Sequence, residues 1–133
     1  MAEERPGRWF QVERAAEAAV VTFTHTDLGE EVARLVGGQM LALLESGGPP
    51  RFVLDFGRVQ RLSSAMLGKL IAFNRKVSQA GGEVALCSLS PALAEKFRST
   101  RLDRFFRILP APAAAVAAAA GADEAGGKTL PPE

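Results

Sequence analysis

The chain has 133 residues, enough for one globular domain and too few for two. Hydrophobic residues make up 47% of it and charged residues 23%, which is the balance of a soluble folded protein. Its 16 Lys and Arg nearly balance 15 Asp and Glu, so it lacks the basic excess that direct nucleic-acid binding usually needs. A single cysteine, Cys87, excludes an internal disulfide. A single histidine, His25, leaves metal binding and histidine-based catalysis short of side chains, so we expect no metal and no cofactor.

Both ends of the chain are expected to lie outside the folded part. Residues 1–7 are charged and contain Pro and Gly, which predicts a flexible N-terminus, and residues 121–133 predict a disordered tail. The folded domain is therefore expected over residues 8–120. No run of about 18 apolar residues exists and the start has no apolar core. We therefore expect a cytoplasmic protein without membrane insertion.

The first half of the chain reads as a hairpin followed by a helix. Apolar residues at Trp9–Val12 and Ala19–Phe23 predict two strands that pair with each other. Asp27 and Glu30 have the spacing of a capping box, which predicts a helix over residues 28–45. Two glycines inside that helix, Gly37-Gly38, would let it pack closely onto a sheet.

From residue 51 onward, buried strands alternate with amphipathic helices. The expected elements are, in chain order, a strand over Phe52–Phe56, a helix from Ser63-Ser64 to Gly81-Gly82, a strand over Val84–Cys87, a helix begun by Ser90-Pro91, a strand over Phe105–Ile108 and an alanine-rich helix after Pro112. Alternation of this kind predicts parallel strands joined by helical crossovers. The fold class is therefore α/β, with a mostly parallel central sheet of about four to five strands and helices packed against it.

Few side chains offer catalytic chemistry. Neither Ser63 nor Ser64 has a base assigned by the sequence, and the hydrolase elbow Gly-x-Ser-x-Gly is absent. Residues 122–129 nearly match a phosphate-binding loop, but the first glycine is missing and no helix follows. Cys87 is expected to be a buried small hydrophobe. Four arginines between residues 98 and 107 are more typical of a solvated face than of a partner surface.

The serine pair has both a structural and a functional interpretation. A serine at the start of a helix acts as N-cap and stabilises the helix by about 1 kcal/mol. The same position tolerates an added phosphate, because a helix N-terminus favours negative charge. A phosphate there would place a new charge on a surface where a partner docks, so the position is compatible with a binary switch.

The segment around these serines resembles the STAS domain, the family of sulfate transporters and anti-sigma factor antagonists. The resemblance covers about residues 10–108. Its features are the strand before the loop, a helix start similar to the family signature Asp-Ser-[Ser/Thr]-Gly, a Gly-Gly turn with a strand after that helix, and the segment Thr100–Phe106. Two positions differ from the signature, because Leu62 replaces the aspartate and Ala65 replaces the glycine.

The resemblance implies a regulatory protein rather than an enzyme. In anti-sigma factor antagonists, an anti-sigma factor serine kinase phosphorylates the serine that follows the aspartate, and phosphorylation ends their binding. By position that serine is Ser63, with Ser64 as second choice, and a phosphatase is a possible further partner. The expected partner surface comprises Leu62, Ser63, Ser64, Met66, Lys69, Arg98 and Arg101.

Two other functions stay open. The changes at Leu62 and Ala65 favour a STAS scaffold subunit that docks constitutively in a signalling or transport assembly and is not phosphorylated. Binding of a nucleotide or another small ligand is a third possibility that the resemblance allows, although no phosphate-binding loop supports it.

Overall fold

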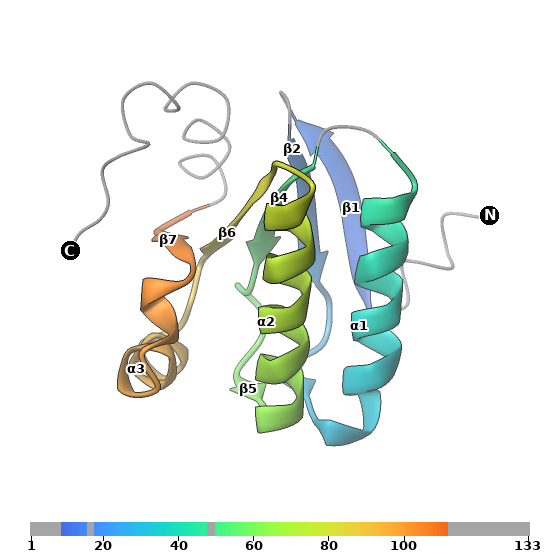
Figure 1. Cartoon of the computed structure of the whole chain (residues 1–133). Coiled ribbons are helices and arrows are strands. Elements are labelled where there is room, and N and C mark those ends of the chain that lie inside the picture. Colours follow the sequence, from blue (N-terminus) through green and yellow to red (C-terminus); the bar gives the residue numbers. More distant parts are fainter. Residues whose placement is uncertain (1–8, 16–17, 48–49, 112–133) are drawn as a thin grey trace.

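A five-stranded sheet forms the centre of the structure, and helices pack against it (Figure 1). The computed structural model describes residues 9–15, 18–47 and 50–111. The sheet contains β1 (Phe10–Ala15), β2 (Ala18–Phe23), β4 (Arg51–Asp55), β6 (Glu83–Cys87) and β7 (Arg107–Leu109). The helices are α1 (Glu30–Glu45), α2 (Ser64–Gln79) and α3 (Pro91–Ser99). Two short strands, β3 (Asp27–Leu28) and β5 (Arg61–Leu62), form a separate pair, and a 3-10 turn, η3 (Leu102–Arg104), precedes β7.

The sheet has the strand order β1-β2-β4-β6-β7. β1 and β2 are antiparallel, as the predicted hairpin requires, and every other neighbouring pair is parallel. One helix connects each parallel pair, and crossovers of one hand that advance in one direction place their helices on one face of the sheet. The predicted α/β fold with a mostly parallel sheet is therefore confirmed.

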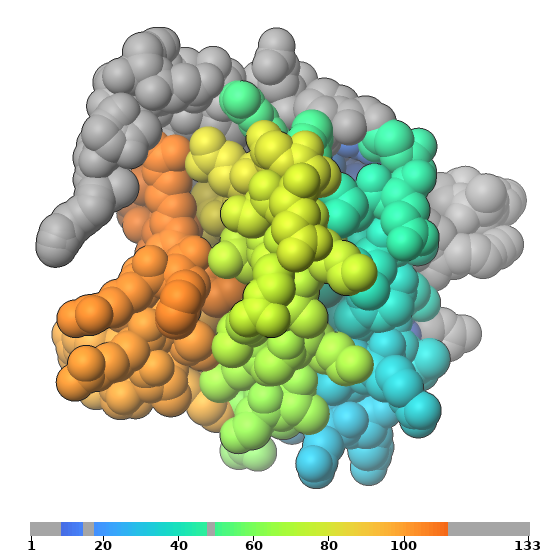
Figure 2. Space-filling view, viewed as in Figure 1, coloured from blue at the N-terminus to red at the C-terminus, as the bar shows by residue number. Residues whose placement is uncertain are grey.

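The main hydrophobic core lies between the sheet and the helices. Alternate residues of the strands, such as Val21, Leu54 and Leu86, point into it and meet Phe73 of α2 and Phe97 of α3. The opposite residues of the same strands form a smaller apolar cluster on the other face, which contains Val53 and Cys87. In Figure 2 the surfaces of α1 and α2 meet side by side along their length.

Helix α2 follows its predicted pattern closely. Its apolar stripe Met66, Leu70, Phe73 and Val77 is at most 2% exposed. The helix ends in a Schellman motif, in which the N–H of Gly82 donates to the carbonyl of Val77 at 2.9 Å. In the same motif Gly81, at φ +83°, donates to the carbonyl of Ser78 at 3.0 Å. The positive φ explains the first glycine of the Gly-Gly turn.

The predicted helix start at Asp27 is wrong. The N-cap of α1 is Gly29, and no side chain caps this end of the helix. Asp27 and Leu28 instead form β3, which pairs in parallel with β5 in the register Asp27↔Arg61. A distant strand therefore uses the residues that a purely local signal assigned to a cap.

The last predicted strand is shifted along the chain. Phe105 is 63% exposed and follows the turn η3, whereas β7 begins at Arg107 and pairs with β6.

The glycines of α1 also act differently from the prediction, because a Cβ on Gly37 would lie 2.9 Å from Cδ of Lys69 on α2. Gly37 thus permits close approach to a helix and not to the sheet. The expected alanine-rich helix and both expected flexible ends lie outside the described residues.

Candidate functional site

The loop that carries the serine pair is held by the β3–β5 pair at the edge of the molecule where α1 and α2 begin (Figure 1). The backbone N–H of Ser63 donates to the carbonyl of Leu28 at 3.1 Å. The N–H groups of Gln60 and Arg61 both donate to the carbonyl of Thr26, at 2.7 and 3.0 Å. These backbone bonds fix the path of the chain into α2, so the serines have defined positions.

Ser63 is the N-cap of α2, as predicted. Its Oγ accepts a hydrogen bond from the N–H of Met66 at 3.0 Å, and its carbonyl accepts from Leu67 at 3.0 Å. The residue is half-buried, whereas Ser64, the first residue of the helix, is exposed. A hydroxyl that accepts one bond still has its proton and a second lone pair available. The Ser63 hydroxyl can therefore cap the helix and still take part in other chemistry.

Two residues of the expected partner surface are core residues. Leu62 is 2% exposed and Met66 is fully buried, and both belong to the main core. Their side chains cannot contact a partner directly in this conformation, so the predicted surface is corrected at these two positions. Ala65, at the second position that departs from the family signature, is partly buried and packs against the same core.

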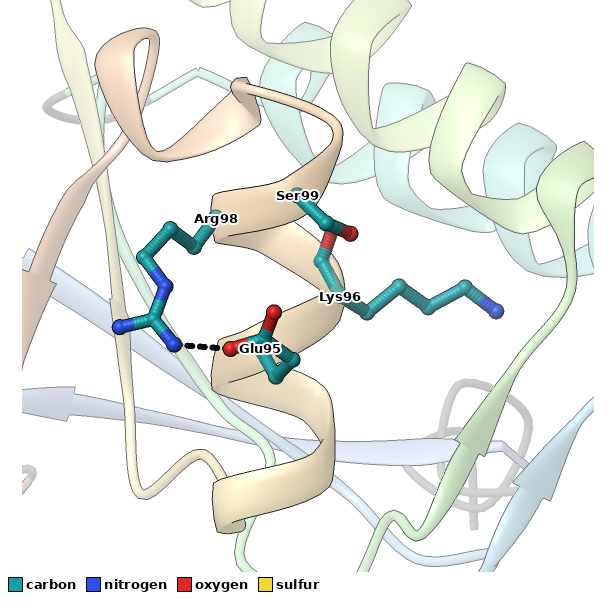
Figure 3. A network of polar contacts seen from close by, with 4 residues as sticks. All are labelled: Glu95, Lys96, Arg98 and Ser99. Carbon is teal, nitrogen blue, oxygen red and sulfur yellow. Dashed lines mark hydrogen bonds and ion pairs between the residues drawn. The ribbon is translucent and has the colours of Figure 1, made fainter.

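The remaining predicted contacts come from more than one element. Lys69 is exposed on α2, and its aliphatic stem lies over Gly37 of α1. Arg98 is exposed on α3 and pairs with Glu95 (Figure 3). Arg101 is exposed after α3 and has a left-handed backbone, with φ 64°. The structure places Ser63 and Ser64 together, while these cations come from separate elements.

Sequence reasoning missed Lys96, which does reach the serine loop. Its Nζ donates to the carbonyl of Leu62 at 2.6 Å from α3. The two residues are 34 positions apart in the sequence, and no local pattern links them. The contact forms because α3 packs beside the loop, and this packing is a property of the tertiary structure.

Cys87 is fully buried, which confirms its expected structural role. Burial is the main cause that raises the pKa of its thiol to about 11. A hydrogen bond with Ser88 opposes that rise, and the negative charge of Asp55 adds to it. The thiol is therefore protonated and unreactive at neutral pH. The ring of His25 lies against Trp9, and its Nδ1 lies 3.1 Å from the hydroxyl of Thr24.

We predict that Cys87 of the folded protein reacts very slowly with iodoacetamide at pH 8 and rapidly once guanidinium unfolds the chain. The raised pKa also determines in which direction the free energy of unfolding changes at alkaline pH. The folded state keeps its proton up to about pH 11, whereas an unfolded thiol loses it near its ordinary value. The free energy of unfolding therefore keeps its full value at neutral pH and falls as the pH rises from about 9 toward 11, because the thiol of the unfolded chain ionises first. Fast alkylation of the native protein would contradict this assignment.

The described part of the chain holds neither a cluster of metal-ligating side chains nor a membrane-spanning helix. No group of three or more His, Cys, Asp or Glu residues in ranges 9–15, 18–47 and 50–111 is arranged to hold a metal ion. Within the same ranges, no helix has the length and apolar character needed to span a membrane.

Comparisons with known proteins identify the family of this chain. The family described as "Mlab, STAS domain" matches residues 10–110. A protein of Bordetella bronchiseptica named "Putative anti-sigma factor antagonist BtrV" is 36% identical over 80 residues, which cover 60% of this chain and 66% of that protein, just under two thirds of its length.

Solved structures show the same fold. An anti-sigma factor antagonist (STAS) domain protein from Planctomyces limnophilus superposes with a TM-score of 0.78 at 23% identity, over 84% of this chain and 98% of that chain. The Bacillus protein SpoIIAA in its phosphorylated form gives a TM-score of 0.61 at 18% identity, over 79% of this chain and 95% of that chain. The chain belongs to the STAS domain family, the family of its anti-sigma factor antagonist relatives.

Proposed function

We propose that this chain is an anti-sigma factor antagonist, a cytoplasmic protein-binding module without enzymatic activity of its own. In its unmodified form it binds and sequesters an anti-sigma factor serine kinase, which releases a sigma factor for transcription. The kinase phosphorylates Ser63, and the phosphorylated form no longer binds. A phosphatase would return the chain to its binding form. The antagonist relative from Bordetella supports this proposal.

The observation that carries the proposal is the position of the Ser63 hydroxyl. It is half-buried at the start of α2, on a loop fixed by backbone hydrogen bonds. Phosphate oxygens can replace Oγ as acceptors for the helix N–H groups, so phosphorylation need not unfold the helix. The change is therefore confined to charge and shape at the loop, which is what a reversible binding switch requires.

The chemistry is a phosphoryl transfer catalysed by the partner. The γ-phosphoryl group of ATP would move to Oγ of Ser63, with formation of an O–P bond and cleavage of the bond to ADP. The hydroxyl proton would go to a base of the kinase. The product carries about −1.5 to −2 charges at pH 7 where the parent side chain is neutral. A partner that buries the neutral loop would then have to bury a charge.

Affinity capture from the native cell extract tests this function. The unmodified chain, Ser63→Asp and the control Ser64→Asp are used as baits, and bound proteins are identified by mass spectrometry. We expect an ATP-binding serine kinase with the unmodified chain and Ser64→Asp, and at least a tenfold loss with Ser63→Asp. Equal capture of that kinase by all three baits would show that Ser63 does not switch binding.

A constitutive scaffold subunit of a signalling or transport assembly is the second candidate. The observations that favour it are the two departures from the family signature, since Leu62 and Ala65 contribute to the core. The same capture experiment separates the candidates. Recovery of assembly subunits without any ATP-binding kinase, unchanged by Ser63→Asp, would support the scaffold.

A further inference from the structure

Lys96 of α3 makes a long-range contact with the loop that carries Ser63. Its Nζ donates to the carbonyl of Leu62 at 2.6 Å, and Lys96 is half-buried. The acceptor carbonyl belongs to the peptide bond that joins Leu62 to Ser63. The ammonium group is therefore hydrogen-bonded to the peptide unit that directly precedes the proposed phosphoacceptor.

No carboxylate neutralises this ammonium group among the residues that the structure describes. The adjacent acid on α3, Glu95, pairs with Arg98. Figure 3 shows Lys96 extending from the helix on the side away from that pair. An ammonium has three N–H donors, and a carbonyl takes one of them without balancing the charge. A partly buried cation in this state interacts favourably with any anion placed beside it.

A phosphate on Ser63 would be such an anion. Covalent geometry limits the distance between Oγ of Ser63 and Nζ of Lys96 to about 8 Å at most, because a single peptide unit and one short side chain separate Oγ from the bonded carbonyl. The phosphate oxygens extend beyond Oγ, and the lysine side chain has four rotatable bonds. A direct contact therefore needs only a change of side-chain rotamer.

We propose that Lys96 is the positioning residue of the switch: it holds the Ser63 loop through the Leu62 carbonyl in the unmodified chain and turns to the phosphate once Ser63 is phosphorylated. This inference rests on the proposed function, in which Ser63 is the phosphoacceptor. In the unmodified chain, Lys96 joins the β3 backbone in fixing the loop from a second side. After phosphorylation its charge stabilises the dianion, and the carbonyl of Leu62 is released to solvent.

The test measures the phosphate directly and does not depend on finding the kinase. Phosphoserine is installed at position 63 during translation, and its second ionisation is followed by 31P NMR. The variants are Lys96→Met, which keeps the length of the side chain without its charge, Lys96→Arg, and the matched control Lys76→Met at the far end of α2. Asp27 and Arg61, the charged residues of the β3–β5 pair, are the same in every variant.

We expect the second pKa of the phosphate, ordinarily near 6, to be higher in Lys96→Met than in the parent by about 0.5 or more. Lys96→Arg should restore the parent value and Lys76→Met should not change it. Identical titration in Lys96→Met and the parent would overturn the inference. If Lys96→Met fails to fold by circular dichroism, Lys96→Gln gives the same comparison.

A second measurement examines the unmodified chain. Hydrogen exchange at the amides of Arg61 and Ser63 should be about threefold faster or more in Lys96→Met than in the parent, and unchanged in Lys76→Met. Unchanged exchange in Lys96→Met would show that Lys96 does not hold the loop. The proposed function fails separately, by unchanged kinase capture with Ser63→Asp, so the two failures are distinguishable.

Discussion

Replacing Ser63 by alanine is expected to abolish phosphorylation of this chain by ATP and the serine kinase that the proposed function requires. The substitution removes the only oxygen at that position that can accept the phosphoryl group. It also removes the cap on the N–H of Met66, so the free energy of unfolding should fall by about 1 kcal/mol. Phosphate incorporation by mass spectrometry and urea denaturation measure the two effects on one protein.

Ser64→Ala is the matched control, because Ser64 is exposed and the cap of α2 is the neighbouring residue. It should keep both phosphorylation and the full stability of the parent. Ser63→Thr should also keep both, since threonine retains a hydroxyl at the cap position. If Ser63→Ala is phosphorylated to the extent of the parent, the acceptor lies elsewhere and the assignment of Ser63 is wrong.

Replacing Gly82 by alanine is expected to have the largest effect on folding. A Cβ at this position would lie 1.7 Å from the carbonyl oxygen of Pro50 and 2.6 Å from its carbonyl carbon. That oxygen also accepts the N–H of Glu83 at 3.1 Å, where β6 begins to pair with β4. The clash is with backbone atoms and cannot be relieved by a rotamer change. We therefore expect the free energy of unfolding to fall by about 3 kcal/mol, at the upper end for overpacked sites.

Gly81→Ala separates this steric effect from backbone strain. Gly81 has a φ of +83° and nothing within 4 Å of an added Cβ, so the cost there is the left-handed conformation alone, about 1 kcal/mol. Urea denaturation midpoints of the two variants give the comparison. An equal decrease in the free energy of unfolding of both variants would show that the backbone at Pro50 moves away from an added Cβ on Gly82 at little cost.

The elements with strong local signals were predictable because their causes lie within a few residues. Ser63 and Ser90 are both N-caps, and each accepts from the N–H three residues ahead. The stripe of α2 repeats at helical spacing and is buried, and the Gly81-Gly82 turn ends that helix. The mostly parallel sheet followed from the alternation of strands and helices.

Predictions failed where a distant segment determined the local structure. Asp27 does not cap α1, because it belongs to β3 and pairs with Arg61 of β5. The aromatic run at Phe105 resembled a strand, but the N–H of Phe105 donates to the carbonyl of Leu102 in the turn, and pairing with β6 begins at Arg107. A strand needs a neighbour for its hydrogen bonds, and a sequence pattern does not show which residues the neighbour reaches.

The candidate site shows the same division. The sequence by itself determined that a serine begins the second helix, because a cap is a bond between residues three apart. Helical spacing already placed Met66 on the buried stripe of α2, whereas only the tertiary structure decided that Leu62 is a buried core residue and not a contact. Only the tertiary structure also brought Lys96 to the loop, from 34 residues away. The reason is physical: burial and long-range charge placement depend on which surfaces pack together, and packing is decided by the whole fold.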